Sequence, residues 1–168
     1  SYTSAIAQTI QLPGISGMDN NMMVFEYDKS SAEGLDQIID NFKLVKAGDY
    51  DVCILGSSHR RVNFRNGIHV WIRSFDYQNS NLMILLSYII SAHPDWQKGK
   101  IRIFDICREE ELEKTRENLL ELVQTGRIPI TEKNIQIIKK DENVSSKVLI
   151  NQNSADAGLT IIGFRAEH

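Results

Sequence analysis

The spacing of hydrophobic and polar positions changes several times along the chain, and the changes predict alternating strands and helices. The pattern is clearest in the middle, where two apolar, β-branched runs at residues 68–72 and 100–106 flank a longer apolar run at 82–90. Apolar residues on both faces are typical of strands buried inside a parallel sheet. This stretch therefore predicts a strand–helix–strand unit in the middle of a sheet, with a helix that is apolar on most of its faces.

The same alternation continues through the rest of the chain. Short apolar runs predict strands, and apolar residues at spacings of three and four predict helices with one face on a sheet. The further predicted strands are residues 22–27, 52–55, 135–138 and 159–164, and the further predicted helices are 3–11, 31–47, 108–124 and 145–152. We therefore expect an α/β fold of three layers, a mostly parallel open sheet with helices on both faces.

A break near the N-terminus suggests how the chain is divided. Pro13-Gly14 and Ser16-Gly17 separate a weakly helical start from the first predicted strand, and such pairs mark turns and linkers. We predict an N-terminal helix and linker at residues 1–20 and one α/β lobe at residues 21–168.

Composition narrows the class of protein. A length of 168 residues fits one domain of ordinary size, and the net charge of −3, with both signs interspersed, offers no basic face to nucleic acid. The longest apolar run is too short to cross a bilayer. The chain starts at Ser1 without an initiator methionine or a signal-peptide pattern, so we read it as a segment of a longer protein.

Cysteines and histidines give no sign of a metal site or a disulfide framework. Cys53 and Cys107 are isolated and lack C-x-x-C spacing, which favours reduced, mostly buried thiols. The histidines lack the spacing of metal ligands, and His69 alternates with apolar neighbours as a structural histidine in a strand would. We expect no metal and no cofactor.

Three blocks of the sequence resemble the cytosolic C-terminal domain of the cation–chloride cotransporters. The first is residues 17–27, in which Met18 and Asn21 match the family while Asp19, Asn20 and Glu26 depart from it. The second is the strand–helix–strand unit, with Val70-Trp71, Tyr88, Trp96 and residues 100–104 in the family's order and spacing. The third is residues 153–162, similar to the family's Ser-x-x-Ala followed by an apolar strand.

The resemblance implies a universal-stress-protein-like fold and a place in the second of two cytosolic lobes. It implies a non-catalytic regulatory and dimerisation domain on the cytoplasmic side of the cell membrane. The membrane part, which would transport chloride with sodium or potassium, and the first lobe would be its partners in the same chain. A homodimer is expected in the full-length protein. The short stretch 59–67 stands where animal members carry a long insertion, which suggests a prokaryotic member.

An alternative is a sensor domain that binds ATP or AMP. Ligands of open α/β sheets bind at the carboxyl ends of the strands. The candidate residues at two such ends are Tyr27, Asp28, Ser30, Gly56, Ser57 and Ser58, with Ser74-Phe75-Asp76 as a further end. The Gly-rich loop that cradles the triphosphate in universal stress proteins is absent, which counts against this alternative.

Two weaker candidates come from residues 56–65. Ser57 and Ser58 precede His59, but no G-x-S-x-G elbow is present. We therefore interpret these serines as part of a strand-to-loop turn and not as a nucleophile. Arg60, Arg61 and Arg65 predict an exposed loop. These arginines are either simply solvated or make a weak contact with the anionic inner leaflet or with an acidic patch on the membrane domain.

Overall fold

The computed structural model describes residues 1–73, 77–125 and 130–164 and divides the chain into two compact units, Ser1–Arg60 and Arg61–His168. Both units contain parallel strands and helices, so the predicted α/β class is confirmed. The strands lie in two sheets, one of two strands and one of four. The division at residues 20 and 21 and the likeness to universal stress proteins stay predictions.

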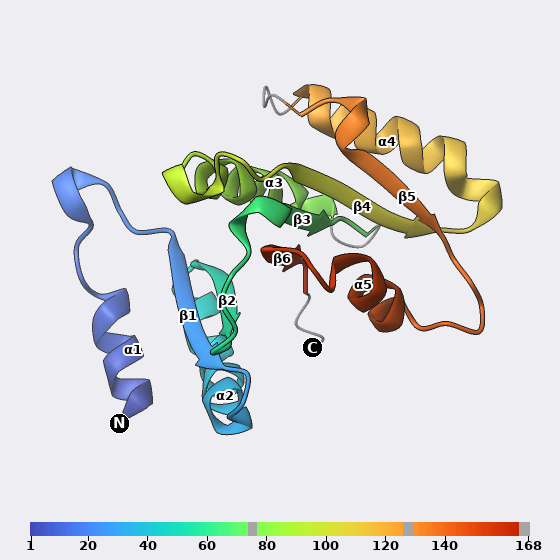
Figure 1. Cartoon of the computed structure of the whole chain (residues 1–168). Helices are drawn as coiled ribbons and strands as arrows, with labels where there is room; N and C mark the ends of the chain where they lie inside the picture. Colours follow the sequence, from blue (N-terminus) through green and yellow to red (C-terminus); the bar gives the residue numbers. More distant parts are fainter. Residues whose placement is uncertain (74–76, 126–129, 165–168) are drawn as a thin grey trace. The chain divides into compact units, whose positions relative to one another are not determined.

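The first unit is a two-stranded parallel sheet with two helices. Its elements are α1 (Tyr2–Ile10), β1 (Met22–Asp28), α2 (Ala32–Ala47) and β2 (Asp51–Ser57), with a short 3-10 helix at Ile15–Gly17 (Figure 1). Met23 and Phe25 of β1 pack against Ile38 and Val45 of α2, because alternate residues of a strand point to one face. On the other face Val24 stays 63% exposed.

The second unit is a four-stranded parallel sheet in the order β5-β4-β3-β6. The strands are β3 (Ile68–Trp71), β4 (Ile101–Cys107), β5 (Ile135–Lys139) and β6 (Leu159–Ile162). The helices are α3 (Tyr77–Ser91), α4 (Leu112–Thr125) and α5 (Ser146–Ser154), with 3-10 helices at Phe64–Asn66, Pro94–Trp96, Glu109–Glu111 and Glu132–Asn134. Figure 1 shows α4 and α5 on opposite sides of this sheet, so helices cover both of its faces.

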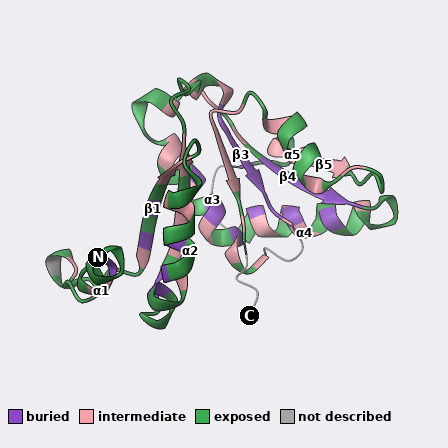
Figure 2. Ribbon diagram, turned by 90° about the horizontal axis from the view of Figure 1, so that it is seen from below, coloured by how far each residue is buried: buried purple, intermediate pink, exposed green. Residues whose placement is uncertain are grey.

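Each face of the four-stranded sheet has its own apolar cluster. On one face Val70 and Ile103 pack with Met83 of α3 and Leu119 of α4. On the other face Trp71, Phe104 and Ile106 pack with the partly buried Leu149 and Ile150 of α5. Figure 2 shows β3 and β4 as the most buried strands. The predicted strand–helix–strand unit in the middle of the sheet is therefore confirmed.

The helix α3 has one buried face and one face that is exposed. Its inner face buries Met83 and Ile84, while Leu85, Tyr88 and Ile89 are 47%, 42% and 57% exposed. Residues at spacings of three and four share one helix face. The apolar run that predicted this helix thus includes an exposed stripe, which we call the α3 stripe (Leu85, Tyr88 and Ile89).

Three glycines meet where β3, β4 and β6 begin. Gly67, Gly99 and Gly158 precede these strands, and the Gly158 N–H donates to the Gly67 carbonyl at 3.0 Å. A Cβ on Gly67 would lie 2.1 Å from the Lys100 oxygen, and Cβ atoms on Gly99 and Gly158 would also meet backbone oxygens at under 3 Å. The three strand starts can approach this closely only because all three residues lack side chains.

The predicted elements are present within the described residues, with shifted ends. The helix predicted from residue 108 begins as the 3-10 turn Glu109–Glu111, and β6 ends at Ile162 instead of residue 164. The segment Ser74-Phe75-Asp76, named above as a strand end, lies outside the described residues. No helix in the part of the chain that the structure describes has both the length and the apolar content to cross a membrane.

Candidate functional site

The carboxyl ends of β1 and β2 bring the predicted candidate residues together. The two strands pair in parallel, with Tyr27 opposite Gly56 and Asp28 opposite Ser57. Ser30 follows β1 in the turn before α2, and Ser58 follows β2. We call these six residues, Tyr27, Asp28, Ser30, Gly56, Ser57 and Ser58, the carboxyl-edge site. The sequence thus predicted which residues share this edge of the two-stranded sheet.

The carboxylate of Asp28 builds the turn that leads into α2. Its Oδ1 accepts hydrogen bonds from the Ser30 N–H and the Ser30 hydroxyl, each at 2.8 Å. The backbone hydrogen bond is the main reason why the pKa of Asp28 is lowered. The other oxygen lies 3.4 Å from His59 Nε2, on an imidazole that is 93% exposed. An Asp that bonds backbone two residues on is typical of an Asx-turn, so a ligand would compete with this turn for the carboxylate.

Gly56 allows two side chains to fold over the end of β2. A Cβ at this position would lie 3.0 Å from the Tyr27 hydroxyl and 2.9 Å from Lys29 Cε. The Ser57 hydroxyl donates to the Tyr27 carbonyl at 3.3 Å, and the Lys29 N–H donates to the Ser57 carbonyl at 2.9 Å. The hydroxyl of Ser57 is directed to backbone and not to His59. This supports the interpretation of residues 56–59 as a strand-to-loop turn.

The described residues form no cluster of metal ligands, and both cysteines have unreactive surroundings. Within residues 1–73, 77–125 and 130–164, no three His, Cys, Asp or Glu residues are grouped to hold a metal ion. Both cysteines are free thiols, Cys107 buried and Cys53 half-buried. Burial raises the pKa of both thiols, which keeps them protonated and poorly nucleophilic. The predicted burial is confirmed for Cys107 and in part for Cys53, and the reduced state of both thiols stays a prediction.

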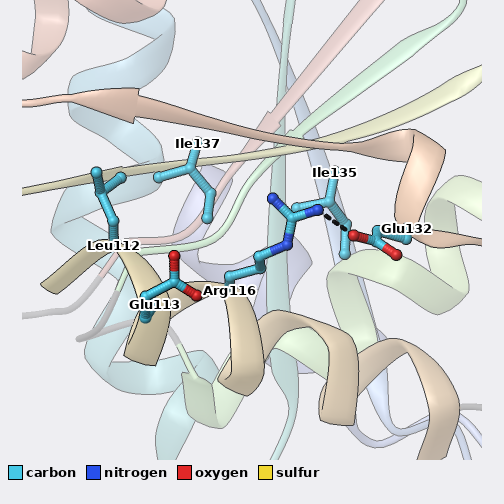
Figure 3. A pocket seen from close by; sticks show the side chains of 6 residues that line it. All are labelled: Leu112, Glu113, Arg116, Glu132, Ile135 and Ile137. Carbon is cyan, nitrogen blue, oxygen red and sulfur yellow. Dashed lines mark hydrogen bonds and ion pairs between the residues drawn. The ribbon is translucent and has the colours of Figure 1, made fainter.

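A shallow groove lies between α4 and the segment that leads into β5. It has a volume of about 240 Å³, with Ile135 and Ile137 on one wall (Figure 3). Arg116 of α4 reaches across it and pairs with Glu132, and this hydrogen bond raises the pKa of Arg116. Because the guanidinium is already matched by a carboxylate, the groove presents a neutralised ion pair over an apolar wall.

Sequence reasoning missed one polar contact inside the second unit. The Ser154 hydroxyl lies 2.8 Å from His69 Nδ1 and 2.9 Å from Trp71 Nε1. His69 is buried and hydrogen-bonded, so its prediction as a structural histidine is confirmed. Ser154 and His69 are 85 positions apart, and no local spacing signals such a pair. Only the fold places α5 across the face of β3 that carries His69 and Trp71.

The chain matches a known protein family over much of its length. A family model described as "Solute carrier family 12" matches residues 57–153, which is more than half of the chain. The matched range runs from the end of β2 through β3, β4, β5 and nearly all of α5. No curated protein is similar enough to the chain to count as a match.

Proposed function

Because the chain belongs to solute carrier family 12, the cation–chloride cotransporters, we propose that it is a non-catalytic, cytosolic regulatory and dimerisation domain of such a transporter. The observation that carries the proposal is the family match across β3 to α5. In this proposal a membrane part elsewhere in the protein moves chloride with sodium or potassium, and this domain controls it from the cytoplasmic side.

The exposed α3 stripe supports a role in protein–protein contact. Apolar residues gathered on one exposed helix face are typical of surfaces that meet another protein. The partners that we propose are the membrane part, the first cytosolic lobe and a second copy of the domain. Arg60, Arg61 and Arg65 are all exposed, which is consistent with a weak contact with the anionic inner leaflet.

The proposed mechanism is mechanical. A domain that contacts the membrane part differently in two transport states changes the balance between those states by its difference in binding free energy. Couplings of this kind are typically worth about 1 to 3 kcal/mol, or about 5- to 150-fold in an equilibrium constant. No chemical step is needed in this domain.

Chloride uptake by the full-length transporter in vesicles tests the proposal. We expect the double variant Leu85→Ser, Ile89→Ser to change the uptake rate about fivefold or more, because it removes an apolar contact between the domain and its partner. Leu12→Ser is a matched control, since Leu12 is 61% exposed outside this helix and should leave uptake unchanged. Uptake that is unaltered even when residues 61–168 are deleted would contradict a regulatory role.

The alternative, a nucleotide sensor, rests on the carboxyl-edge site and has a separate test. A ligand that binds only the folded protein must raise its melting temperature. At 100 times its Kd it would stabilise the protein by about 2.7 kcal/mol. We expect no change in the melting temperature of the purified chain in millimolar ATP, ADP or AMP, because Asp28 and Ser57 already bond within the turn. A shift that disappears in Gly56→Val would instead favour the sensor.

A further inference from the structure

Three side chains connect α5 to the sheet. Ser154, at the end of α5, places its hydroxyl oxygen 2.8 Å from His69 Nδ1 and 2.9 Å from Trp71 Nε1. His69 and Trp71 are two positions apart on β3, so both point to the face that α5 covers. The contact therefore joins a helix to the centre of the sheet. We call it the Trp71–Ser154–His69 chain.

The donors and acceptors of these three side chains match when His69 is neutral and carries its hydrogen on Nε2. The indole N–H of Trp71 can only donate, so the Ser154 oxygen accepts from it. The Ser154 hydroxyl hydrogen is then free to donate to an unprotonated Nδ1 of His69. When both ring nitrogens of His69 carry hydrogen, Nδ1 becomes a donor instead. Ser154 would then accept twice, and its own hydrogen would lose Nδ1 as an acceptor.

The surroundings of His69 also oppose a positive charge. The residue is 3% exposed, and its ring centroid lies 4.8 Å from that of Phe104. Arg102 is its direct neighbour on β4, and the uncharged Thr160 is its neighbour on β6. Burial and then Arg102 lower the pKa of His69, while Asp156, beyond α5, acts in the opposite direction.

Apart from the Trp71–Ser154–His69 chain, few buried contacts hold α5 to the sheet. None of its residues is fully buried. Leu149 and Ile150 are its apolar contacts with the cluster of Trp71, Phe104 and Ile106, and both are only partly buried. By contrast α4 buries Leu119 and Val123. Elements with few buried contacts are the ones that open first. Loss of the Trp71–Ser154–His69 chain should therefore make α5 much easier to release from the sheet.

We propose that the Trp71–Ser154–His69 chain is an acid-sensitive latch, which holds α5 over the sheet while His69 is neutral and releases it when His69 is protonated. The inference stands on contacts within the second unit and does not depend on the proposed function. The latch is complete above pH 6.5, the ordinary pKa of histidine. As the pH falls from there to the lower pKa of the latched state, the equilibrium for release of α5 rises by up to tenfold per pH unit. Below the latched pKa it changes no further.

Amide hydrogen exchange on the purified chain between pH 7.5 and pH 5 tests the latch. After correction for the intrinsic pH dependence of exchange, we expect the amides of residues 148–154 to lose protection at acid pH while β3 and β4 keep theirs. His69→Gln cannot be protonated, so its α5 should show no such loss. His93→Gln is the matched control, because His93 is an exposed histidine of the same unit, and it should respond as the wild type does.

Two further measurements keep the result decisive. Ser154→Ala removes the hydroxyl that links Trp71 to His69 but leaves His69 unchanged. The helix α5 should therefore be poorly protected at both pH values. The ring proton signal of His69 in the wild-type protein reports its protonation, and its midpoint should coincide with the loss of protection in α5 even if His69→Gln fails to fold. An α5 that stays protected at pH 5, or that opens at a midpoint unrelated to His69, would overturn the proposal.

Discussion

The variant Gly67→Ala is expected to lose at least about 3 kcal/mol of folding free energy in the four-stranded unit. Gly67 has φ 76° and ψ −162°, a region that is essentially restricted to glycine and costs other residues about 1 to 3 kcal/mol. The added Cβ would also lie 2.1 Å from the Lys100 oxygen. That oxygen accepts the hydrogen bond from Ile68 N–H with which β3 begins to pair with β4, so relief of the overlap must disturb the pairing.

Urea unfolding followed by tryptophan fluorescence measures this loss. Both tryptophans, Trp71 and Trp96, lie in the second unit, so the signal reports that unit alone. Gly17→Ala is the matched control, because Gly17 has φ +75° but no atom within 4 Å of the added Cβ. It should leave the fluorescence transition in place. Equal transitions for the wild type and Gly67→Ala would show that the strand starts are not packed as tightly as described.

The second large effect is expected for Leu119→Ala, which should destabilise the same unit by about 2 to 5 kcal/mol. Leu119 is 0% exposed and packs in the cluster that joins α3 and α4 to the sheet. Truncation removes the transfer free energy of the buried methyl groups and leaves a cavity that a rigid parallel sheet can only partly close. Alanine favours helix at least as well as leucine, so the loss would reflect packing and not helix propensity.

Leu85→Ala makes the same chemical change on an exposed helix face. Leu85 is 47% exposed on α3, and we expect its truncation to shift the transition of the isolated chain by less than about 0.5 kcal/mol. The same variant in the full-length transporter would also remove part of the proposed contact surface. A large loss for Leu85→Ala in the isolated chain would mean that the α3 stripe is already covered there.

The elements of the fold were predictable because they depend on local patterns. β-branched runs gave β3 and β4, and apolar spacings of three and four gave α2 and α4. The division of the strands into two sheets was not predictable in this way, because sheet membership depends on which strands pair across long separations. The exposed stripe of α3 was missed for a related reason: an apolar helix position is consistent with burial in the domain and equally with a surface meant for a partner.

The carboxyl-edge site and the contact of Ser154 with His69 also differ in whether a local pattern predicts them. The carboxyl-edge site follows from the rule that parallel strands end at one edge, and Tyr27 and Gly56 do lie opposite each other. The Ser154 contact with His69 depends on the crossover through α5, which no motif marks. What the sequence could not supply was the donor and acceptor geometry, which shows that Asp28 and Ser57 bond within their own turn.

The pairing of β6 with β3 also affects how the protein folds while it is being synthesised. β6 pairs with β3, although Ile68 and its partner Leu159 are separated by 91 positions (159 minus 68). At 5 to 20 residues per second, the ribosome needs about 5 to 20 s to add that length of chain. Throughout this interval one edge of the apolar strand β3 has no partner, and open apolar edges recruit other chains. A recombinant fragment cut at residue 153, where the family match ends, would keep that edge open permanently and should aggregate.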